Sequence, residues 1–452
     1  MPADHNPLAE RLARVVGADH VLAEPELKAG YERDLTGRYA GEALLVVRPA
    51  GADEVAGVLR ECAAAGTAVV PQGGHTGMVG GGTPRNGEVV LATTRLTGIE
   101  DLDEAASQVT CGAGVPLAAL QGFVRERGFD FGVDLPARGT ATIGGMTATN
   151  AGGAFALRYG TMRAQVAGLE AVLADGSRIE RLGGLLKDTA GMDLAALLVG
   201  SEGTLGVVTR VRLRLVPRLP KRVTALLAFR DTARALEVLG VLRRSAPSLH
   251  AFDYMHAPGL RRVCERFGLP PPFHDEHDVV VVAECAATED PSDELLAVAD
   301  LVEEAAVATA AAEREALWRY RELHNEAITA LGVPHKLDVS VPPAAVPAFE
   351  RDVVEALREL APDAELILFG HLGDGNVHVN VLGPPPEDER VDETVLRLVR
   401  RHRGSIAAEH GVGVAKTRWL QLTRSPEEIE AMRAIKHALD PGGLLAPGRM
   451  LP

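Results

Sequence analysis

The chain has 452 residues, of which 62 are acidic and 47 are Lys or Arg, so its formal net charge is −15. This charge argues against nucleic acid as a partner, because proteins that bind nucleic acid carry basic surfaces. An apolar share of 46% excludes general disorder, and the length predicts about three structural units at roughly 150 residues each. Glycine and proline together make about 17% of the chain, against an ordinary share of about 12%.

The four cysteines are widely spaced, at Cys62, Cys111, Cys264 and Cys285. They form neither a CxxC metal motif nor a dense disulfide framework, so we expect a reducing, cytoplasmic setting. The first residues lack the basic and apolar parts of a signal peptide. No stretch reaches the ~18 uncharged apolar residues of a membrane span. The sequence therefore predicts a soluble, unprocessed protein without a membrane span.

Strand-like and helix-like patterns alternate along the first half of the chain, after a margin of short helices up to residue 40. This alternation predicts an α/β or α+β architecture. Strands are expected at 44–49, 67–70, 87–93, 107–114, 167–176 and 206–217, and helices at 53–66, 116–128 and 193–200.

The second half has longer helical patterns, separated by a few strands, and we place a domain boundary near 219. Helices are expected at 232–247, 293–328 and 345–360, and strands at 224–229, 278–285 and 365–370. A final helix and a Gly/Pro-rich tail complete the chain. The run 274–278 contains two histidines and three acidic residues, but it follows three prolines, and we interpret it as a loop rather than a metal site.

Glycine is concentrated in three loops, at 71–82, 134–153 and 200–209. Each loop could be a set of tight turns, which is the commonest use of glycine. Glycine also lets successive backbone amides approach an anion closely, which makes a site for phosphates. Three such loops favour a large, phosphate-bearing cofactor. The segment Gly112–Gly114 lacks the last glycine of GxGxxG, which argues against a nicotinamide site.

The three loops, PQGGHTGMVGG, TIGGMTATNAGG and GSEGTLGVVT, resemble the FAD-binding domain of the vanillyl-alcohol oxidase/PCMH superfamily. Their order and spacing are similar to the branch that contains D-2-hydroxyglutarate dehydrogenase, D-lactate dehydrogenase and the glycolate oxidase FAD subunit. The resemblance extends from about residue 40 to 452. It implies an α+β fold: a two-lobed PCMH-type FAD-binding domain and an α+β cap domain with an antiparallel sheet flanked by helices. The corresponding segments are 1–40 (helical), 41–219 (FAD-binding), 220–420 (substrate- and metal-binding cap) and 421–452 (returning to the FAD domain).

The same resemblance implies which residues bind FAD. In the first loop these are Pro71, Gly73, Gly74, His75, Thr76, Gly77, Gly80 and Gly81, around the pyrophosphate. In the second and third loops they are Ala137, Thr140, Thr142, Gly144, Gly145, Thr147, Asn150, Gly152, Gly153, Glu202, Gly203, Val207 and Val208.

His75 departs from most of this branch, where Asn or Gly is usual. In covalent members of the superfamily, a GGH sequence supplies a histidine that is bonded to the flavin. The sequence leaves two roles for His75 open: a covalent link to FAD, and an ordinary hydrogen-bonding or solvent-facing imidazole.

Two histidines and a carboxylate stand out in the second half. His371 and His378 flank a Gly-Asp-Gly turn between two expected strands, so a hairpin can bring both imidazoles together. Together with Glu409 they suit a divalent metal, although an unliganded structural pair is the alternative on spacing alone. The resemblance favours the metal: it implies His371, His378 and Glu409 as ligands of Zn or Mn, and His410 as the base.

The resemblance also assigns substrate contacts to Arg321, Asn325, Lys336 and Asn380. Arginine can hold a carboxylate through two parallel hydrogen bonds, and lysine supplies a point charge. Asn325 stands where hydroxyglutarate-type relatives tend to have threonine. The implied activity is FAD-dependent oxidation of a D-2-hydroxy acid to the 2-oxo acid, with a D-2-hydroxyglutarate-like substrate preferred.

Three alternatives remain from the sequence: a D-lactate or glycolate dehydrogenase, an oxygen-using oxidase with covalent FAD, and a flavoprotein that only binds partners. The motifs do not identify the electron acceptor, and a homodimer is the expected oligomer on general frequency.

Overall fold

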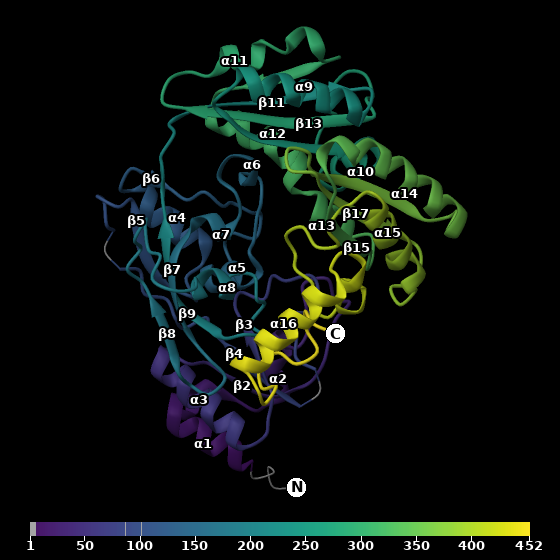
Figure 1. Ribbon diagram of the computed structural model, residues 1–452. Helices are drawn as coiled ribbons and strands as arrows, with labels where there is room; N and C mark the ends of the chain where they lie inside the picture. Colours follow the sequence, from purple (N-terminus) through teal and green to yellow (C-terminus); the bar gives the residue numbers. More distant parts are fainter. Residues whose placement is uncertain (1–5, 86, 101) are drawn as a thin grey trace. The chain divides into compact units, whose positions relative to one another are not determined.

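A computed structural model describes residues 6–85, 87–100 and 102–452. The chain forms two compact units, which are coloured along the sequence in Figure 1. Unit 1 comprises residues up to Gly152, then Gly160–Pro217 and Glu409–Pro452; unit 2 comprises Gly153–Tyr159 and Arg218–Ala408. This division differs from the predicted boundaries in two places. The return to unit 1 begins at Glu409 rather than 421, and the short segment 153–159 belongs to unit 2.

The first lobe of unit 1 contains a four-stranded sheet in the order β1-β2-β4-β3. Strands β2 (Ala43–Val47), β4 (Glu88–Ala92) and β3 (Val69–Gln72) are parallel, and β1 (Val21–Leu22) is antiparallel to β2. Helices α1 (Pro7–Val16) and α3 (Ala52–Ala64) bury Leu12, Val55 and Leu59 against this sheet. The near-continuous apolar strands are typical of a parallel sheet covered on both faces. The short helix α2 (Pro25–Lys28) precedes β2.

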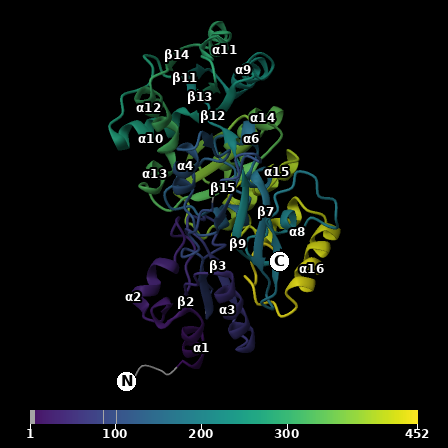
Figure 2. The same cartoon turned by 90° about the vertical axis from the view of Figure 1, so that its left-hand side faces the viewer.

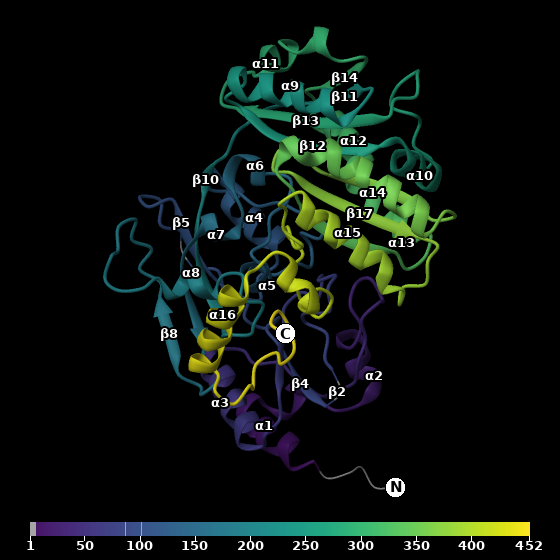
Figure 3. The same ribbon diagram turned by 45° about the vertical axis from the view of Figure 1, so that its right-hand side comes forward.

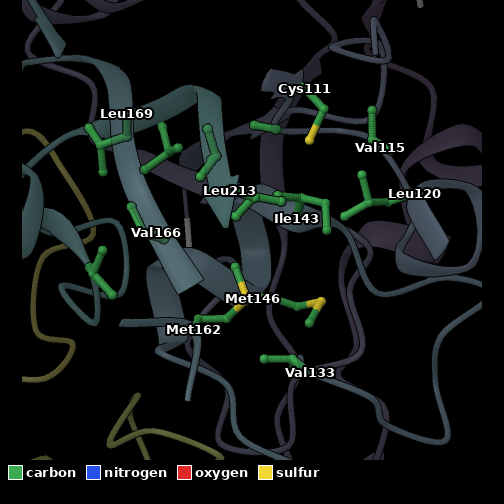
Figure 4. Close-up of a cluster of buried hydrophobic side chains, with 14 of the residues drawn as sticks. Cys111, Val115, Leu120, Val133, Ile143, Met146, Met162, Val166, Leu169 and Leu213 are labelled. Carbon is green, nitrogen blue, oxygen red and sulfur yellow. The ribbon is translucent and has the colours of Figure 1, made fainter. Parts of the chain in front are cut away.

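The second lobe contains an antiparallel sheet in the order β5-β9-β7-β8. Its strands are β5 (Gln108–Gly112), β9 (Val207–Arg214), β7 (Val166–Val172) and β8 (Arg178–Arg181), and β6 (Phe129–Asp130) pairs separately with β10 (Val216–Pro217). The lobe's helices are α4 (Leu117–Arg125), α5 (Ile143–Thr149), α7 (Met162–Gln165) and α8 (Leu194–Leu198). Figure 4 shows their common core, in which Ile143 and Met146 of α5 lie among Leu120, Leu169 and Leu213.

The C-terminal segment is built into unit 1 by buried polar contacts. Helix α16 (Pro426–Leu439) begins with a capping box between Ser425 and Glu428, and Figures 2 and 3 place it beside α8. The Nζ of Lys436 donates to the carbonyl oxygen of Thr204 at 2.7 Å. Beyond the helix, the buried guanidinium of Arg449 bonds both carboxylate oxygens of Glu88, at 2.8 and 2.7 Å.

Unit 2 is built on a seven-stranded antiparallel sheet in the order β14-β11-β13-β12-β16-β17-β15. Its strands are β11 (Lys221–Phe229), β12 (Leu249–His256), β13 (Val279–Ala287), β14 (Ala305–Ala308), β15 (His335–Ser340), β16 (Glu365–His371) and β17 (Asn376–Leu382). Helices α10 (Ala257–Phe267), α12 (Ala311–Glu322) and α13 (His324–Thr329) pack on one face, around Met255, Ile367 and Phe369. Helices α9 (Thr232–Ser245), α14 (Val346–Leu360) and α15 (Glu389–Arg401) belong to the other face (Figure 3). Two short helices, α6 (Ala156–Tyr159) and α11 (Ser292–Leu296), complete the unit.

The predicted α+β class, with an antiparallel sheet flanked by helices in the second half, is confirmed. The hairpin expected around His371 and His378 is also confirmed as β16 and β17. The single helix predicted over 293–328 is wrong. The structure has α11, then strand β14, then α12 and α13, because the segment Ala305–Ala308 pairs with β11 as the edge of the sheet. Pairing with a neighbouring strand here overrides the helical propensity of an alanine-rich run. Among the described residues, no helix is long and apolar enough to cross a membrane.

His277 lies in the loop between α10 and β13, within the run that we interpreted as a loop. Its Nδ1 lies 3.1 Å from a carboxylate oxygen of Glu303, and its Nε2 lies 3.0 Å from one of Glu304. Partial burial alone would lower the pKa of His277, but the hydrogen bonds to Glu304 and Glu303 raise the pKa above its ordinary value. The run 274–278 is thus joined to the segment before β14 by ion pairs.

We expect protonated His277 to stabilise the protein at mildly acidic pH. Because its folded-state pKa is raised, the contribution is fully present below the unfolded pKa of about 6.5. It is lost as the pH rises through the folded-state pKa. The melting temperature of His277→Gln should therefore fall further below that of wild type at about pH 6 than at about pH 8. The ion pairs of His277 should contribute about 1 kcal/mol or less to the free energy of unfolding. His274→Gln is the control, since this side chain is 94% exposed. A deficit that does not change with pH would contradict the expectation.

Candidate functional site

The first glycine loop follows β3 and offers a run of unused backbone donors. No backbone N–H group from Gly73 to Gly82 donates a hydrogen bond to any residue that the structure describes. Backbone donors that have no protein partner are the groups that bind phosphate in glycine-rich loops. Seven of these ten residues are half-buried rather than fully exposed. The loop therefore provides the donor set that a pyrophosphate requires.

The first and second glycine loops lie in direct contact. A Cβ added at Gly73 would lie 2.4 Å from Oγ1 of Thr142, and one at Gly74 would lie 1.9 Å from the carbonyl oxygen of Thr140. Neither position has room for a side chain. In the second loop, Thr142 caps α5 by accepting a hydrogen bond from the N–H of Gly145 at 3.3 Å. The two loops thus form one surface of closely approaching backbone, which suits the phosphates of FAD.

Other predicted FAD residues have structural roles in unit 1. Thr147 is fully buried, and its hydroxyl donates to the carbonyl oxygen of Ile143 at 2.8 Å. Asn150 ends α5 at a φ of 53° and accepts hydrogen bonds from Thr161 and Arg163. The other predicted FAD residues lie along unit 1 and at its border in sequence with unit 2. Pro71 lies near the end of β3, Val207 and Val208 are buried in β9, Gly144 contacts Ala113, and Ala137 packs against the core. Thr76, Gly77, Gly80 and Gly81 lie in the first loop, and Gly152 and Gly153 lie where the chain passes from one unit to the other.

His75 has a left-handed backbone, with a φ of 54°. Its Nε2 donates a hydrogen bond to the carbonyl oxygen of Arg33 at 2.5 Å. Burial lowers the pKa of His75, against the opposing effects of this hydrogen bond and of the nearby Asp34 carboxylate. The imidazole therefore has a defined hydrogen-bonding role in the protein.

Glu202, in the third glycine loop, holds the loop that follows His410. One carboxylate oxygen accepts the N–H of Val412 at 2.8 Å, and the other accepts the N–H of Gly413 at 2.7 Å. Burial raises the pKa of Glu202, and these two hydrogen bonds act in the opposite direction. The N–H of Val414 also bonds the carbonyl oxygen of Val79 at 2.9 Å. The segment after Glu409 and His410 is thus held to the first and third glycine loops, within unit 1.

We expect Gly74→Ala to lose most of its bound FAD. The added methyl would overlap the carbonyl oxygen of Thr140, so the two loops would have to move apart at a cost of about 1–3 kcal/mol. FAD retained after gel filtration should fall by about tenfold or more, since 1.4 kcal/mol corresponds to tenfold in affinity. Gly122→Ala in α4, outside the three glycine loops, is the control, because a Cβ there meets nothing within 4 Å. A Gly74→Ala protein with the FAD content of wild type would contradict a role for the contact between the first and second glycine loops in FAD binding.

In unit 2, polar side chains gather on the sheet face covered by α12 and α13. His371 and His378 come from β16 and β17, with ring centroids 5.6 Å apart. The Nδ1 of His371 donates to Oδ1 of Asp253 in β12 at 2.8 Å. The Nδ1 of His378 lies 3.5 Å from Oδ1 of Asp338 in β15. Each imidazole is thus accompanied by a buried carboxylate, an arrangement that orients the Nε2 of a metal-binding histidine.

The predicted substrate residues lie on the same face. The Nε of Arg321 lies 3.2 Å from Oδ2 of Asp253, and an NH2 group of Arg321 lies 3.5 Å from Nε2 of His371. The Nζ of Lys336 donates to Oδ1 of Asn325 at 2.6 Å. Asn380 is fully buried and donates to the carbonyl oxygens of Ile367 and His378, both at 3.3 Å. Arg321 therefore lies close to His371. Lys336 lies on β15, the strand that pairs with the strand of His378.

Glu409 and His410 follow directly after the last residue of unit 2. Within unit 1, Nε2 of His410 lies 3.7 Å from a carboxylate oxygen of Glu409. The preceding residue, Ala408, donates its N–H to Oδ2 of Asp338 at 3.1 Å within unit 2. Glu409 therefore follows directly along the chain after the residue whose N–H is bonded to Asp338.

Sequence patterns did not identify three polar residues of this face. Asp253 lies in β12, a strand that was not predicted, within the run LHAFDYMH. Asp338 lies in β15 and Asn376 in β17, and neither was assigned a role in the site. The amide of Asn376 donates to Oδ1 of Asp338 at 2.8 Å.

Comparison with solved structures supports the fold. The chain is similar in fold to p-cresol methylhydroxylase, in a structure with substrate bound, at a TM-score of 0.77 and 17% identity. The match covers 98% of this chain and 96% of that one. The family model "FAD binding domain" matches residues 43–181, which contain the first two glycine loops. The fold and the matched domain thus define a flavoprotein with an FAD-binding domain.

The family model "FAD linked oxidases, C-terminal domain" matches residues 218–450. The chain is 38% identical over 455 residues to D-2-hydroxyglutarate dehydrogenase of Xanthomonas citri pv. viticola, covering 97% of this chain and 96% of the relative. It is 37% identical to the mitochondrial D-2-hydroxyglutarate dehydrogenase of Bos taurus, covering 98% of this chain and 82% of the relative. The chain belongs to the FAD-linked oxidases, in the family that includes these dehydrogenases, and the resemblance stated above is confirmed.

Proposed function

We propose that this protein oxidises a D-2-hydroxy acid of the D-2-hydroxyglutarate type to the corresponding 2-oxo acid, with FAD as the acceptor of the hydride. The observation that carries the proposal is the polar face of unit 2, where Arg321 lies beside His371 and Lys336 lies on the strand paired with that of His378. Two cations near two imidazoles suit a substrate with two carboxylates and a hydroxyl group. The names of the relatives point to the same substrate.

The substrate carboxylates would be bound by Arg321 and Lys336. The guanidinium of Arg321 is almost completely buried and lies over the ring of Phe369, 4.7 Å from its centroid. A charge in this setting is only weakly screened by solvent, so it attracts a carboxylate more strongly than a surface arginine does. Asn325 and Asn380 would add neutral polar contacts. The net charge of the chain does not oppose this binding, because local cations determine the potential within a site.

A divalent metal, Zn or Mn, would be held by His371, His378 and Glu409. The residues present suit such an ion, since the Nδ1 of His371 is bonded to Asp253 and its Nε2 carries the lone pair that a metal requires. Ala408 is held by Asp338 beside His378, which places Glu409 one residue away along the chain. When bound, the metal would lower the pKa of the substrate hydroxyl and leave coordination positions for the substrate.

His410 would act as the general base that removes the proton of the substrate hydroxyl. Its loop is held by the hydrogen bonds from Val412 and Gly413 to Glu202. When bound, FAD supplies the electron chemistry by accepting a hydride from the α-carbon. Arg321 and Lys336 would fix the orientation of that carbon, and such positioning can contribute several kcal/mol to the lowering of the barrier.

FAD is proposed to be bound without a covalent link. His75 has its Nε2 committed to the carbonyl oxygen of Arg33, which supports a hydrogen-bonding role. We therefore expect acid precipitation of the pure protein to release all of the flavin into the supernatant. Yellow colour or flavin fluorescence that stays in the washed pellet would contradict this expectation and favour a covalent link at His75.

The four cysteines are free, and three of them are buried. This supports the proposal that the protein works in a reducing compartment such as the cytoplasm. The second substrate is proposed to be an electron acceptor other than oxygen, as for a dehydrogenase.

A substrate screen with an artificial dye as the electron acceptor tests the proposed function. We expect rapid dye reduction with D-2-hydroxyglutarate, and slower reduction with D-lactate or glycolate, because one of the two cations would lack a carboxylate. Activity with D-lactate and none with D-2-hydroxyglutarate would overturn the substrate assignment. Rapid peroxide formation under air in the absence of dye would favour the oxidase.

A further inference from the structure

The carboxylate of Asp253 contacts two site residues at once, one through each oxygen. Oδ1 accepts a hydrogen bond from Nδ1 of His371 at 2.8 Å, and Oδ2 lies 3.2 Å from Nε of Arg321. Asp253 is 2% exposed, so neither contact is exchanged readily with water. The three residues come from three elements, β12, β16 and α12, that meet on one face of the unit 2 sheet.

The contact with Asp253 fixes the protonation pattern of His371. A carboxylate accepts hydrogen bonds, so Nδ1 carries a proton, and in the neutral imidazole the lone pair then lies on Nε2. It also fixes the ring plane, because the bond is short and the acceptor is buried in a strand. Histidines that bind metals commonly have such a partner, and its removal weakens metal binding by about 10- to 100-fold.

The contact with Arg321 fixes the direction of the guanidinium. Asp253 lies at the Nε edge, and Phe369 lies under the plane of the group. These two contacts direct a terminal NH2 group toward Nε2 of His371, at 3.5 Å. Because a buried guanidinium without a partner is strongly unfavourable, Arg321 depends on Asp253 for its position.

We propose that Asp253 is a positioning residue that sets both the metal ligand His371 and the substrate-binding Arg321. Metal affinity and binding of a substrate carboxylate would then depend on one buried carboxylate, which acts through His371 and Arg321 rather than by contact with the metal or the substrate. This inference rests on the proposed function, in which His371 binds the metal and Arg321 binds the substrate.

The test measures two quantities on the full-length, FAD-loaded protein: the Kd for Zn²⁺ by competition with a chelator, and the KM for D-2-hydroxyglutarate by dye reduction. In Asp253→Asn we expect the Kd for Zn²⁺ to rise by about 10- to 100-fold and the KM to rise as well. His371→Ala should raise the Kd for Zn²⁺ by a similar factor. Arg321→Lys should raise the KM and leave the Kd for Zn²⁺ within about twofold of wild type, as expected when only the substrate contact changes.

Glu350→Gln is the matched control. Glu350 is a buried carboxylate with two side-chain partners: Nε2 of His256 at 3.0 Å and the hydroxyl of Thr232 at 2.7 Å. His256 lies in β12, the same strand as Asp253. Its substitution should lower the melting temperature without changing the Kd for Zn²⁺ or the KM. The contrast separates positioning from general loss of stability.

A folded Asp253→Asn protein with the wild-type Kd for Zn²⁺ and the wild-type KM would overturn the inference. The inference would also be overturned if Glu350→Gln changed the Kd and the KM as much as Asp253→Asn does. Should Asp253→Asn not fold, Asp253→Glu retains the charge but has a longer side chain that cannot keep both contacts. We expect the same two changes in that variant, and wild-type values in it would overturn the inference. A wild-type protein that binds neither Zn²⁺ nor Mn²⁺ would instead contradict the proposed function itself.

Discussion

Substitution of His410 by alanine should lower kcat for D-2-hydroxyglutarate by about 10²- to 10⁴-fold, the usual contribution of a general base. The KM should change little, because the carboxylates of the substrate are assigned to Arg321 and Lys336 on unit 2. FAD should stay bound, because the segment after His410 is held to Glu202 by the backbone amides of Val412 and Gly413, which the substitution retains. The measurement is steady-state dye reduction together with the flavin absorption of the purified variant.

The control for this variant is His437→Ala. His437 is exposed on α16 in the same C-terminal segment, and its removal should leave kcat unchanged. A His410→Ala protein with kcat within a few-fold of wild type would remove His410 from the role of base. Loss of activity that is accompanied by loss of FAD would show instead that the loop held by Glu202 is needed for the cofactor.

Substitution of His378 by alanine should remove both metal and activity. His378 is 4% exposed, beside His371 and Asp338, and its loss leaves one of the two imidazole ligands. Because a metal contributes several kcal/mol to charge stabilisation in the transition state, we expect kcat/KM to fall by about 10²-fold or more. Metal content after dialysis should fall in parallel, as measured by elemental analysis.

Chelation of the wild-type protein should produce the same loss, and addition of Zn²⁺ or Mn²⁺ should reverse it in wild type but not in His378→Ala. His402→Ala is the control within unit 2, because His402 bonds Asp352 at 2.9 Å on α14. It should retain metal and activity. Full activity of the wild-type protein after exhaustive chelation would refute the metal proposal.

The sequence was sufficient for the fold wherever apolar periodicity agreed with the tertiary contacts. Strand β3 and its glycine loop, and the β16–β17 hairpin, follow directly from apolar runs that end in glycine turns. The alanine-rich run at 305–308 was assigned to a helix because propensity is local, whereas its role as an edge strand depends on pairing with β11. Strand β12 was missed because its polar and aromatic residues, LHAFDYMH, interrupt the apolar pattern.

For the candidate site, the motifs predicted the residues that would contact the metal, the substrate or FAD. They did not predict the residues that position those side chains. His371 and Arg321 were assigned their proposed roles in this way. Asp253 was not, since it is 68 residues from Arg321 and 118 from His371 along the chain, and only the sheet register brings the three together. Glu202 was predicted to line the cofactor, and its hydrogen bonds with the amides of Val412 and Gly413 were not predicted. Such contacts between distant segments have no local sequence signal.

The central claim is that this FAD-linked oxidase transfers a hydride from D-2-hydroxyglutarate to its own flavin. The most direct test is the visible absorption spectrum of the purified, oxygen-free protein before and after addition of D-2-hydroxyglutarate. We predict an oxidised flavin spectrum at first, and rapid bleaching of the flavin band on addition of this substrate. A protein that contains FAD but keeps its oxidised spectrum with D-2-hydroxyglutarate, while D-lactate bleaches it, would contradict the account.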